Sequence, residues 1–155
     1  MYCMSAESKL KLYLDSCALQ RPFDDASQLR VRIEADAVTE LIAAFERGDV
    51  LLLGSDVLNY EIAQIPEANR RGPVERLLRL RCHFVTLTNE IEVRAAEFEK
   101  YGIKAFDAYH LASAIAANAD YFCTTDDRFR RKAFEQQTGL TQVVSPLELI
   151  QNIKI

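Results

Sequence analysis

Short apolar runs alternate with helix-length segments along most of the chain, and this alternation is the strongest constraint on its fold. The runs have the length and character of buried strands, and polar residues or glycine end most of them. We expect strands at 9–15, 50–53, 84–87, 121–123 and 142–144. Because helical patterns separate these runs, the order predicts an α/β fold, with a parallel sheet covered by helices on both faces.

Capping residues and helix breakers predict where the helices lie. Ser55 and Thr88 are good N-caps, and glycine ends helices because it accepts a positive φ. The expected helices cover 27–47 (capped by Ser27 or Asp25), 56–65, 67–81 with a break at Gly72-Pro73, 88–101, a segment from about 104, a segment after 126, and a last one opened by Pro146. A loop is expected at 21–25, and Gly54-Ser55 is expected to end the second strand.

Composition predicts one ordinary globular domain over 1–155, without repeat or linker. The 155 residues are 49% apolar and 27% charged, and no apolar run reaches the length that spans a bilayer. The first residues lack the pattern of a secretory signal, so we expect a cytoplasmic protein. A net charge of −4 excludes general electrostatic attraction of the whole surface to nucleic acid, which leaves a local basic patch or a bound metal ion.

The cysteines and histidines do not have the spacing of a zinc site. There is no Cys-x-x-Cys pair, and the thiols are expected to be reduced, as in a cytoplasm. The residues concerned are Cys3, Cys17, Cys82, Cys123, His83 and His110.

Four acidic residues stand where a parallel sheet would bring them together. Asp15 and Asp126 each follow an apolar strand, whereas Glu61 and Asp107 fall on the inner stripes of two expected helices. Open α/β sheets bind ligands at the carboxyl ends of their strands. Four carboxylates at one edge repel one another unless a cation joins them, and Mg²⁺ or Mn²⁺ prefers such oxygen ligands. The chemistry that this favours is metal-assisted hydrolysis of a phosphodiester.

The same residues resemble the PIN domain, the nuclease domain of many VapC-like toxins in VapBC toxin–antitoxin pairs and of solitary prokaryotic PIN nucleases. The resemblance extends over about 9–145. The matching pieces are Tyr-Leu-Asp-Ser-Cys at 13–17, Val-Leu-Asn-Tyr-Glu-Ile at 57–62, Phe-Asp-Ala-Tyr-His-Leu-Ala-Ser-Ala at 106–114 and Thr-Thr-Asp-Asp-Arg-Phe at 124–129.

This resemblance implies a three-layer α/β/α sandwich and a ribonuclease that depends on Mg²⁺ or Mn²⁺. Asp15, Glu61 and Asp107 would form the acidic core and Asp126 the fourth acid, with hydroxyls from Ser16 or Thr124 near it. Asp127 stands beside Asp126, and which of the two faces the metal is open. The resemblance also implies a possible homodimer and an antitoxin partner, although the segment at 21–25 is closer to the solitary subgroup.

Several side chains have two interpretations. His110 is either a general base or a packed histidine, and Tyr109 and Phe129 either stack on bases or, as we prefer, fill the core. Cys17 is expected to be buried and inert. The basic run at 70–81 is interpreted as a solvated helix face. A second run could bind RNA phosphates, and it comprises Arg128, Arg130, Arg131 and Lys132.

Two alternatives to an endoribonuclease remain. A haloacid-dehalogenase-type phosphatase also places an aspartate after the first strand, but it needs a second aspartate two residues later, where this chain has Cys17. A PIN-like module could instead bind RNA or a protein without cutting. The full set of four acids argues against that module.

Overall fold

The fold is built on a parallel sheet of five strands with the order β3-β2-β1-β4-β5. The computed structural model describes residues 9–80 and 83–153, so Cys3, Cys82 and the expected end of a helix at 81 lie outside the described residues. The strands are β1 (Lys11–Leu14), β2 (Leu51–Ser55), β3 (His83–Val85), β4 (Tyr121–Cys123) and β5 (Gln142–Val144). All the pairings are parallel, as the alternation of elements predicts.

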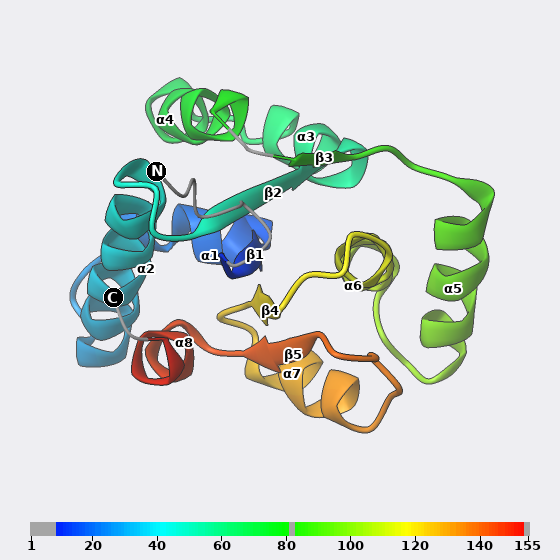
Figure 1. Cartoon of the computed structure of the whole chain (residues 1–155). Coiled ribbons are helices and arrows are strands. Elements are labelled where there is room, and N and C mark those ends of the chain that lie inside the picture. The colour runs from blue at the N-terminus through cyan, green and yellow to red at the C-terminus, as the bar shows by residue number, and fades with distance from the viewer. Residues whose placement is uncertain (1–8, 81–82, 154–155) are drawn as a thin grey trace, which may run out of the picture.

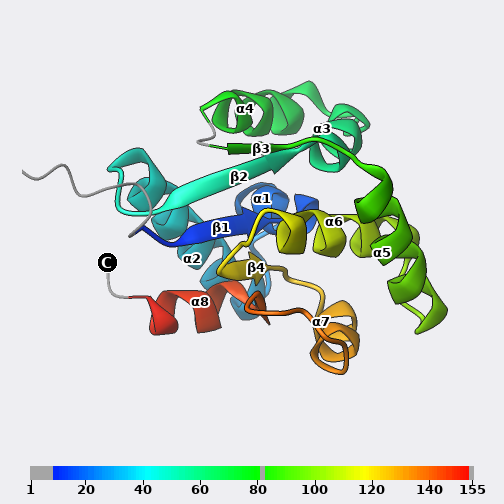
Figure 2. The same ribbon diagram turned by 45° about the vertical axis from the view of Figure 1, so that its right-hand side comes forward.

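Helices cover both faces of this sheet and complete the predicted three-layer sandwich. They are α1 (Ser16–Gln20), the 3-10 turn η2 (Arg21–Phe23), α2 (Leu29–Glu46), α3 (Asp56–Ala63), α4 (Ala68–Arg79), α5 (Asn89–Lys100), α6 (Ala105–Ala116), α7 (Asp127–Phe134) and α8 (Pro146–Asn152). Figure 1 shows α2 and α8 on one side of the molecule and α5 and α6 on the other, and Figure 2 shows the same separation in a view turned by 45°. Among the described residues, no helix is long and apolar enough to cross a membrane.

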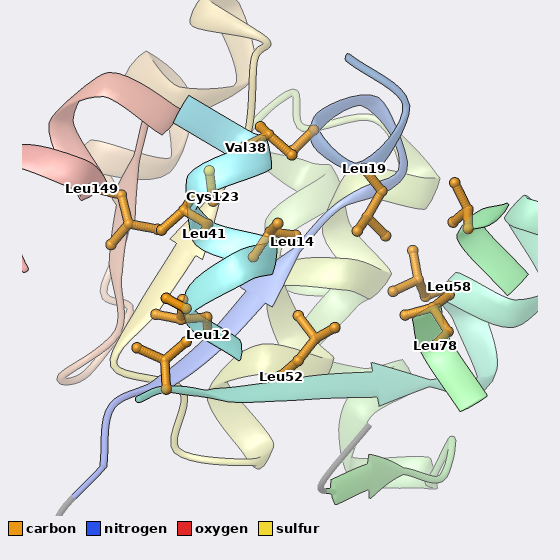
Figure 3. Close-up of a cluster of buried hydrophobic side chains, with 14 of the residues drawn as sticks. Leu12, Leu14, Leu19, Val38, Leu41, Leu52, Leu58, Leu78, Cys123 and Leu149 are labelled. Carbon is orange, nitrogen blue, oxygen red and sulfur yellow. The ribbon is translucent and has the colours of Figure 1, made fainter. Parts of the chain in front are cut away.

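Successive side chains of a strand point to opposite faces of the sheet, so a separate hydrophobic core lies on each face. Leu12 and Leu14 of β1 point to one face, where they pack with residues of α1, α2, α3, α4 and α8 (Figure 3). Tyr13, between them, points to the other face and packs with α5, α6 and α7. Ala108, Ala112 and Ala114 of α6 face this second core and are buried, so their small side chains let the helix lie close to the sheet.

The strand order creates a crevice beside β1. The chain leaves β1 toward β2 on one side, whereas it leaves β4 toward β5 on the other. Adjacent strands whose connections diverge leave a gap at their carboxyl ends, the place where open α/β sheets bind ligands. Asp15 follows β1 directly, and Thr124 follows β4, so the crevice receives residues from two of the sequence motifs.

Two expected breaks do not occur. β2 continues through Gly54 to Ser55, because Gly54 pairs with Phe84 and Ser55 with Val85 of β3. α4 continues through Pro73. Proline in a helix removes one backbone hydrogen bond, but the burial of Val74 and Leu78 against the core holds the segment helical.

The predictions for 15–28 were also partly wrong. Residues 21–23 form a 3-10 turn instead of a loop, and α1 precedes it. Neither Ser27 nor Asp25 caps α2, which begins after Gln28 without a side-chain cap. Asp25 instead accepts a hydrogen bond from the Ser27 N–H at 3.0 Å. Ser55, Thr88, Asp126 and Ser145 do cap their helices.

Candidate functional site

Asp15 lies buried at the end of β1 and is held by three neighbours. Its Oδ1 accepts hydrogen bonds from the Ala18 N–H and from the Cys17 thiol, each at 3.0 Å. The Thr124 hydroxyl contributes a third hydrogen bond. Burial raises the pKa of Asp15, and these bonds oppose the rise. The side chain therefore both caps α1 and presents a fixed carboxylate to the crevice.

Cys17 is unreactive in this setting. Burial, with the Asp15 carboxylate beside it, raises the pKa of the Cys17 thiol to about 12. A thiol that stays protonated at neutral pH is a poor nucleophile, which agrees with the prediction of an inert cysteine, although Cys17 is half-buried and not buried as expected.

Glu61 points inward from α3 toward α6, as the helical phase predicts. Its side chain is 28% exposed, and Oε1 lies 3.4 Å from Nε2 of His110. Partial burial pushes the pKa of Glu61 upward, but the interaction with the nearby His110 ring and a hydrogen bond from Ser16 outweigh this, so that the pKa falls below its ordinary value. Glu61 is therefore ionised at neutral pH and has a fixed orientation.

His110 belongs to a buried polar chain that the sequence interpretation missed. Its Nδ1 lies 2.6 Å from the Tyr13 hydroxyl, which lies 2.8 Å from Oγ of Ser55. Ser55 Oγ also accepts the Leu58 N–H as the cap of α3. If Ser55 donates to Tyr13 and Tyr13 donates to His110 Nδ1, the proton of the neutral imidazole is on Nε2. Nε2 lies 3.4 Å from Glu61 and forms no hydrogen bond among the described residues.

These hydrogen bonds correct the interpretation of His110 from the sequence. His110 is packed, which is one of its two predicted interpretations, but its ring also supports Glu61 instead of only filling space. Tyr13 stands two residues before Asp15, and residues two apart in a strand point to the same face, so a tyrosine hydroxyl on the face of Asp15 was the available signal. Burial raises the pKa of Tyr13 well above its ordinary value, which keeps its hydroxyl a donor.

Asp107 occupies the first turn of α6 and is half-buried. Its pKa rises to about 6, first because it is partly desolvated and then because Asp15, Asp126 and Glu61 are nearby negative charges. His110 opposes this shift only in part. Asp107 is thus repelled by the carboxylates of the other three acidic motifs.

Asp126, not Asp127, faces Asp107. Asp126 and Asp107 line the same pocket, together with Lys104, Arg128 and Lys132. Asp126 is also the N-cap of α7, since Oδ1 accepts the Phe129 N–H at 3.0 Å, and its own N–H donates to Oγ1 of Thr124 at 3.1 Å. Thr124 therefore contacts both Asp126 and Asp15.

Asp127 points to a different part of the surface. Its carboxylate pairs with Arg30 at 2.7 Å and with Arg130 at 3.2 Å. Arg130 also pairs with Glu148. These ion pairs hold the Arg130 side chain, which does not line the pocket that Arg128 and Lys132 line. Arg131 is exposed on α7 and is not among the residues that line the pocket of Asp107.

The donor set fits a hard divalent cation. Asp15, Asp107 and Asp126 form no ion pair with Lys or Arg within the residues described, whereas Asp24, Glu34 and Asp127 each pair with arginine. However, no three His, Cys, Asp or Glu side chains in the described ranges already stand close enough to enclose one ion. Since like charges spread apart, a bound cation would have to draw these carboxylates closer.

Comparison with known proteins supports the fold described above. The PIN domain family model matches residues 12–135, which contain all four acids. No match is found among curated proteins. The fold is similar to a chain in the crystal structure of VapBC2 from Rickettsia felis bound to a DNA fragment from their promoter, with a TM-score of 0.58 and 12% identity over 88% of this chain and 98% of that one. PIN domains are in general nucleases, and this chain belongs to the PIN domain family.

Proposed function

We propose that the protein is a divalent-metal-dependent endoribonuclease whose site is formed by Asp15, Glu61, Asp107 and Asp126. One observation carries the proposal. Three carboxylates from other motifs, Asp15, Glu61 and Asp126, lie near enough to Asp107 to raise its pKa, and none of the four acids pairs with Lys or Arg among the described residues. Such a concentration of negative charge destabilises a protein unless it serves a cation.

The chain's own residues would divide the work as follows. Asp15, Asp107 and Asp126 would hold Mg²⁺ or Mn²⁺, and Glu61 would complete the set directly or through a water molecule. Such an ion supplies activated water and stabilises charge on the phosphoryl and leaving oxygens. Ala18 and Thr124 fix Asp15, while His110 and Ser16 fix Glu61. Preset orientation of this kind reduces the reorganisation needed during reaction.

Substrate phosphates would bind at the basic side chains beside the acids. Lys104, Arg128 and Lys132 line the pocket of Asp107 and Asp126. Arg128 and Lys132 lie one helical turn apart on α7, so both can face the same pocket. Nucleic-acid backbones bind such local cationic groups even when the whole protein is acidic.

The decisive experiment is cleavage of an RNA panel with and without Mn²⁺. We expect cleavage only with metal, and loss of cleavage in Asp107→Asn and in Asp126→Asn. Asn is as good an N-cap as Asp, so Asp126→Asn removes the charge and keeps the start of α7. The matched control is Asp127→Asn, which should still cleave. Metal-dependent binding without cleavage by the wild type would favour the non-cleaving module instead.

A toxin role with an antitoxin partner is a narrower proposal. It is supported by the family and by the fold shared with the Rickettsia felis VapBC2 structure. If it holds, a small protein encoded beside this gene should copurify with the chain and inhibit its RNA cleavage. Failure of any neighbouring product to bind would favour the solitary nuclease. Homodimerisation stays a prediction from the resemblance.

A further inference from the structure

Two aromatic rings meet on the surface between α3 and α6. Tyr60 and Phe106 lie with their ring centroids 6.0 Å apart and their planes at 22°, which is an offset stacked pair. Tyr60 is 60% exposed and Phe106 is 44% exposed. A residue on each of two helices, forty-six positions apart in sequence, thus contributes to one apolar surface.

Packing does not account for the exposure of these rings. The aromatic residues that serve the core are buried, as Phe122 and Phe129 are at 0% and 3% exposure. α3 and α6 already meet through the contact of Glu61 with His110. An aromatic side chain left in water forgoes the free energy that burial would give it. Exposure of two such rings in contact is therefore better explained by a ligand than by the core.

The position of the pair relative to the acids is specific. Tyr60 immediately precedes Glu61, and Phe106 immediately precedes Asp107. The next residue on each helix thus belongs to the proposed metal site. The basic pocket of Lys104, Arg128 and Lys132 also adjoins Asp107. A strand of nucleic acid that crosses Asp107 would come within reach of Phe106, the preceding residue, and of the cations that line the pocket of Asp107.

We propose that Tyr60 and Phe106 form a stacking platform for an unpaired base of the RNA, next to the phosphodiester to be cleaved. Bases stack on aromatic side chains with little regard to sequence, because every base has a π face. A base inside a duplex has both faces covered, so the platform selects single-stranded RNA. This inference rests on the proposed ribonuclease function and adds the structural class of its substrate.

Binding to short RNAs in EDTA tests the platform, since the proposed cleavage needs metal. Tyr60→Ala and Phe106→Ala should each weaken binding of a single-stranded RNA about five- to a hundredfold. Tyr60→Phe keeps a ring and should bind like the wild type. Phe134→Ala is the matched control, because Phe134 is 89% exposed at the far end of α7. An abasic strand of equal charge should bind the wild type and the alanine variants alike.

A spectroscopic signal gives a second readout that a structural role would not produce. The chain has no tryptophan, so Tyr60→Trp introduces a single indole at the platform. Its fluorescence should be quenched when single-stranded RNA binds and should change little with the abasic strand. Phe134→Trp is the control, and its signal should not respond to either RNA.

The outcomes separate this inference from the proposed function. Equal RNA affinity of the wild type and both alanine variants overturns the platform, even if the protein cleaves RNA. Loss of affinity in those variants supports it, even if no cleavage is found with any metal. Two further results also overturn it: duplex RNA bound as tightly as single strands, or a protein partner whose binding, unlike that of RNA, depends on Tyr60 and Phe106.

Discussion

The imidazole of His110 joins Glu61 to the buried hydroxyl of Tyr13, with Nε2 3.4 Å from Glu61 Oε1 and Nδ1 2.6 Å from the Tyr13 oxygen. A side chain of the proposed site is therefore oriented from inside the second core. Histidine rings held through their second nitrogen are a common way to fix the geometry of a polar site. Here the ring fixes a carboxylate, so the core and the site depend on each other.

Tyr13→Phe should lower both stability and cleavage. The substitution keeps the ring but removes the donor to His110 Nδ1, which leaves a buried acceptor unpaired, at a cost of about 1–3 kcal/mol in the free energy of unfolding. Since His110 would then be free to change tautomer, we expect kcat to fall about tenfold or more with little change in KM. Urea unfolding and steady-state kinetics measure the two effects. Tyr109→Phe, on the same α6, is the matched control and should change neither.

Asp107→Asn should abolish cleavage and stabilise the metal-free protein. Burial and three nearby carboxylates raise the pKa of Asp107 from 3.8 to about 6. Such a shift corresponds to about 3 kcal/mol at full burial, which solvent screening of this half-exposed group reduces to about 1–2 kcal/mol. In the absence of metal, the Tm of the variant should rise by about 3–6 °C. Asp36→Asn, at an exposed acid of α2, is the control and should leave Tm unchanged.

The stabilisation by Asp107→Asn should depend on pH in a defined direction. Between pH 3.8 and about 6 the native state binds more protons at Asp107 than the unfolded state does, so this group loses stability as the pH rises through that window. The difference in unfolding free energy between the variant and the wild type should therefore be largest above pH 6 and vanish near pH 4. Urea titrations at several pH values without metal measure it. A difference that grows toward acid pH would contradict the clustering of acids around Asp107.

Most of the architecture could be predicted from the sequence, because apolar runs mark the strands and capping residues mark the starts of several helices. Ser55 and Thr88 cap the expected helices, and the strands at 121–123 and 142–144 have the expected bounds. The errors at Gly54 and Pro73 share a cause, since local propensity was outweighed by pairing with β3 and by burial of α4.

The site could be predicted less completely, because side-chain partners depend on contacts between distant elements. Periodicity placed Glu61 on the inner face of its helix. No local sequence pattern indicated the hydrogen bonds that connect Ser55, Tyr13 and His110. Among the aromatic residues, the sequence interpretation considered Tyr109 and Phe129 for stacking, yet both pack in the second core. Tyr60 and Phe106 are the exposed pair, and only the approach of α3 to α6 reveals it.

The basic run after Asp126 should divide into two functional halves. Arg128 and Lys132 line the pocket of Asp107, whereas Arg130 is held in ion pairs with Asp127 and Glu148. Each lost phosphate contact lowers the slope of log affinity against log salt by about 0.7 for a single strand. We therefore expect Arg128→Gln and Lys132→Gln each to weaken RNA binding and to reduce that slope. Arg130→Gln should lower stability but keep the slope, and an equal loss of slope in all three variants would show that the whole run contacts RNA.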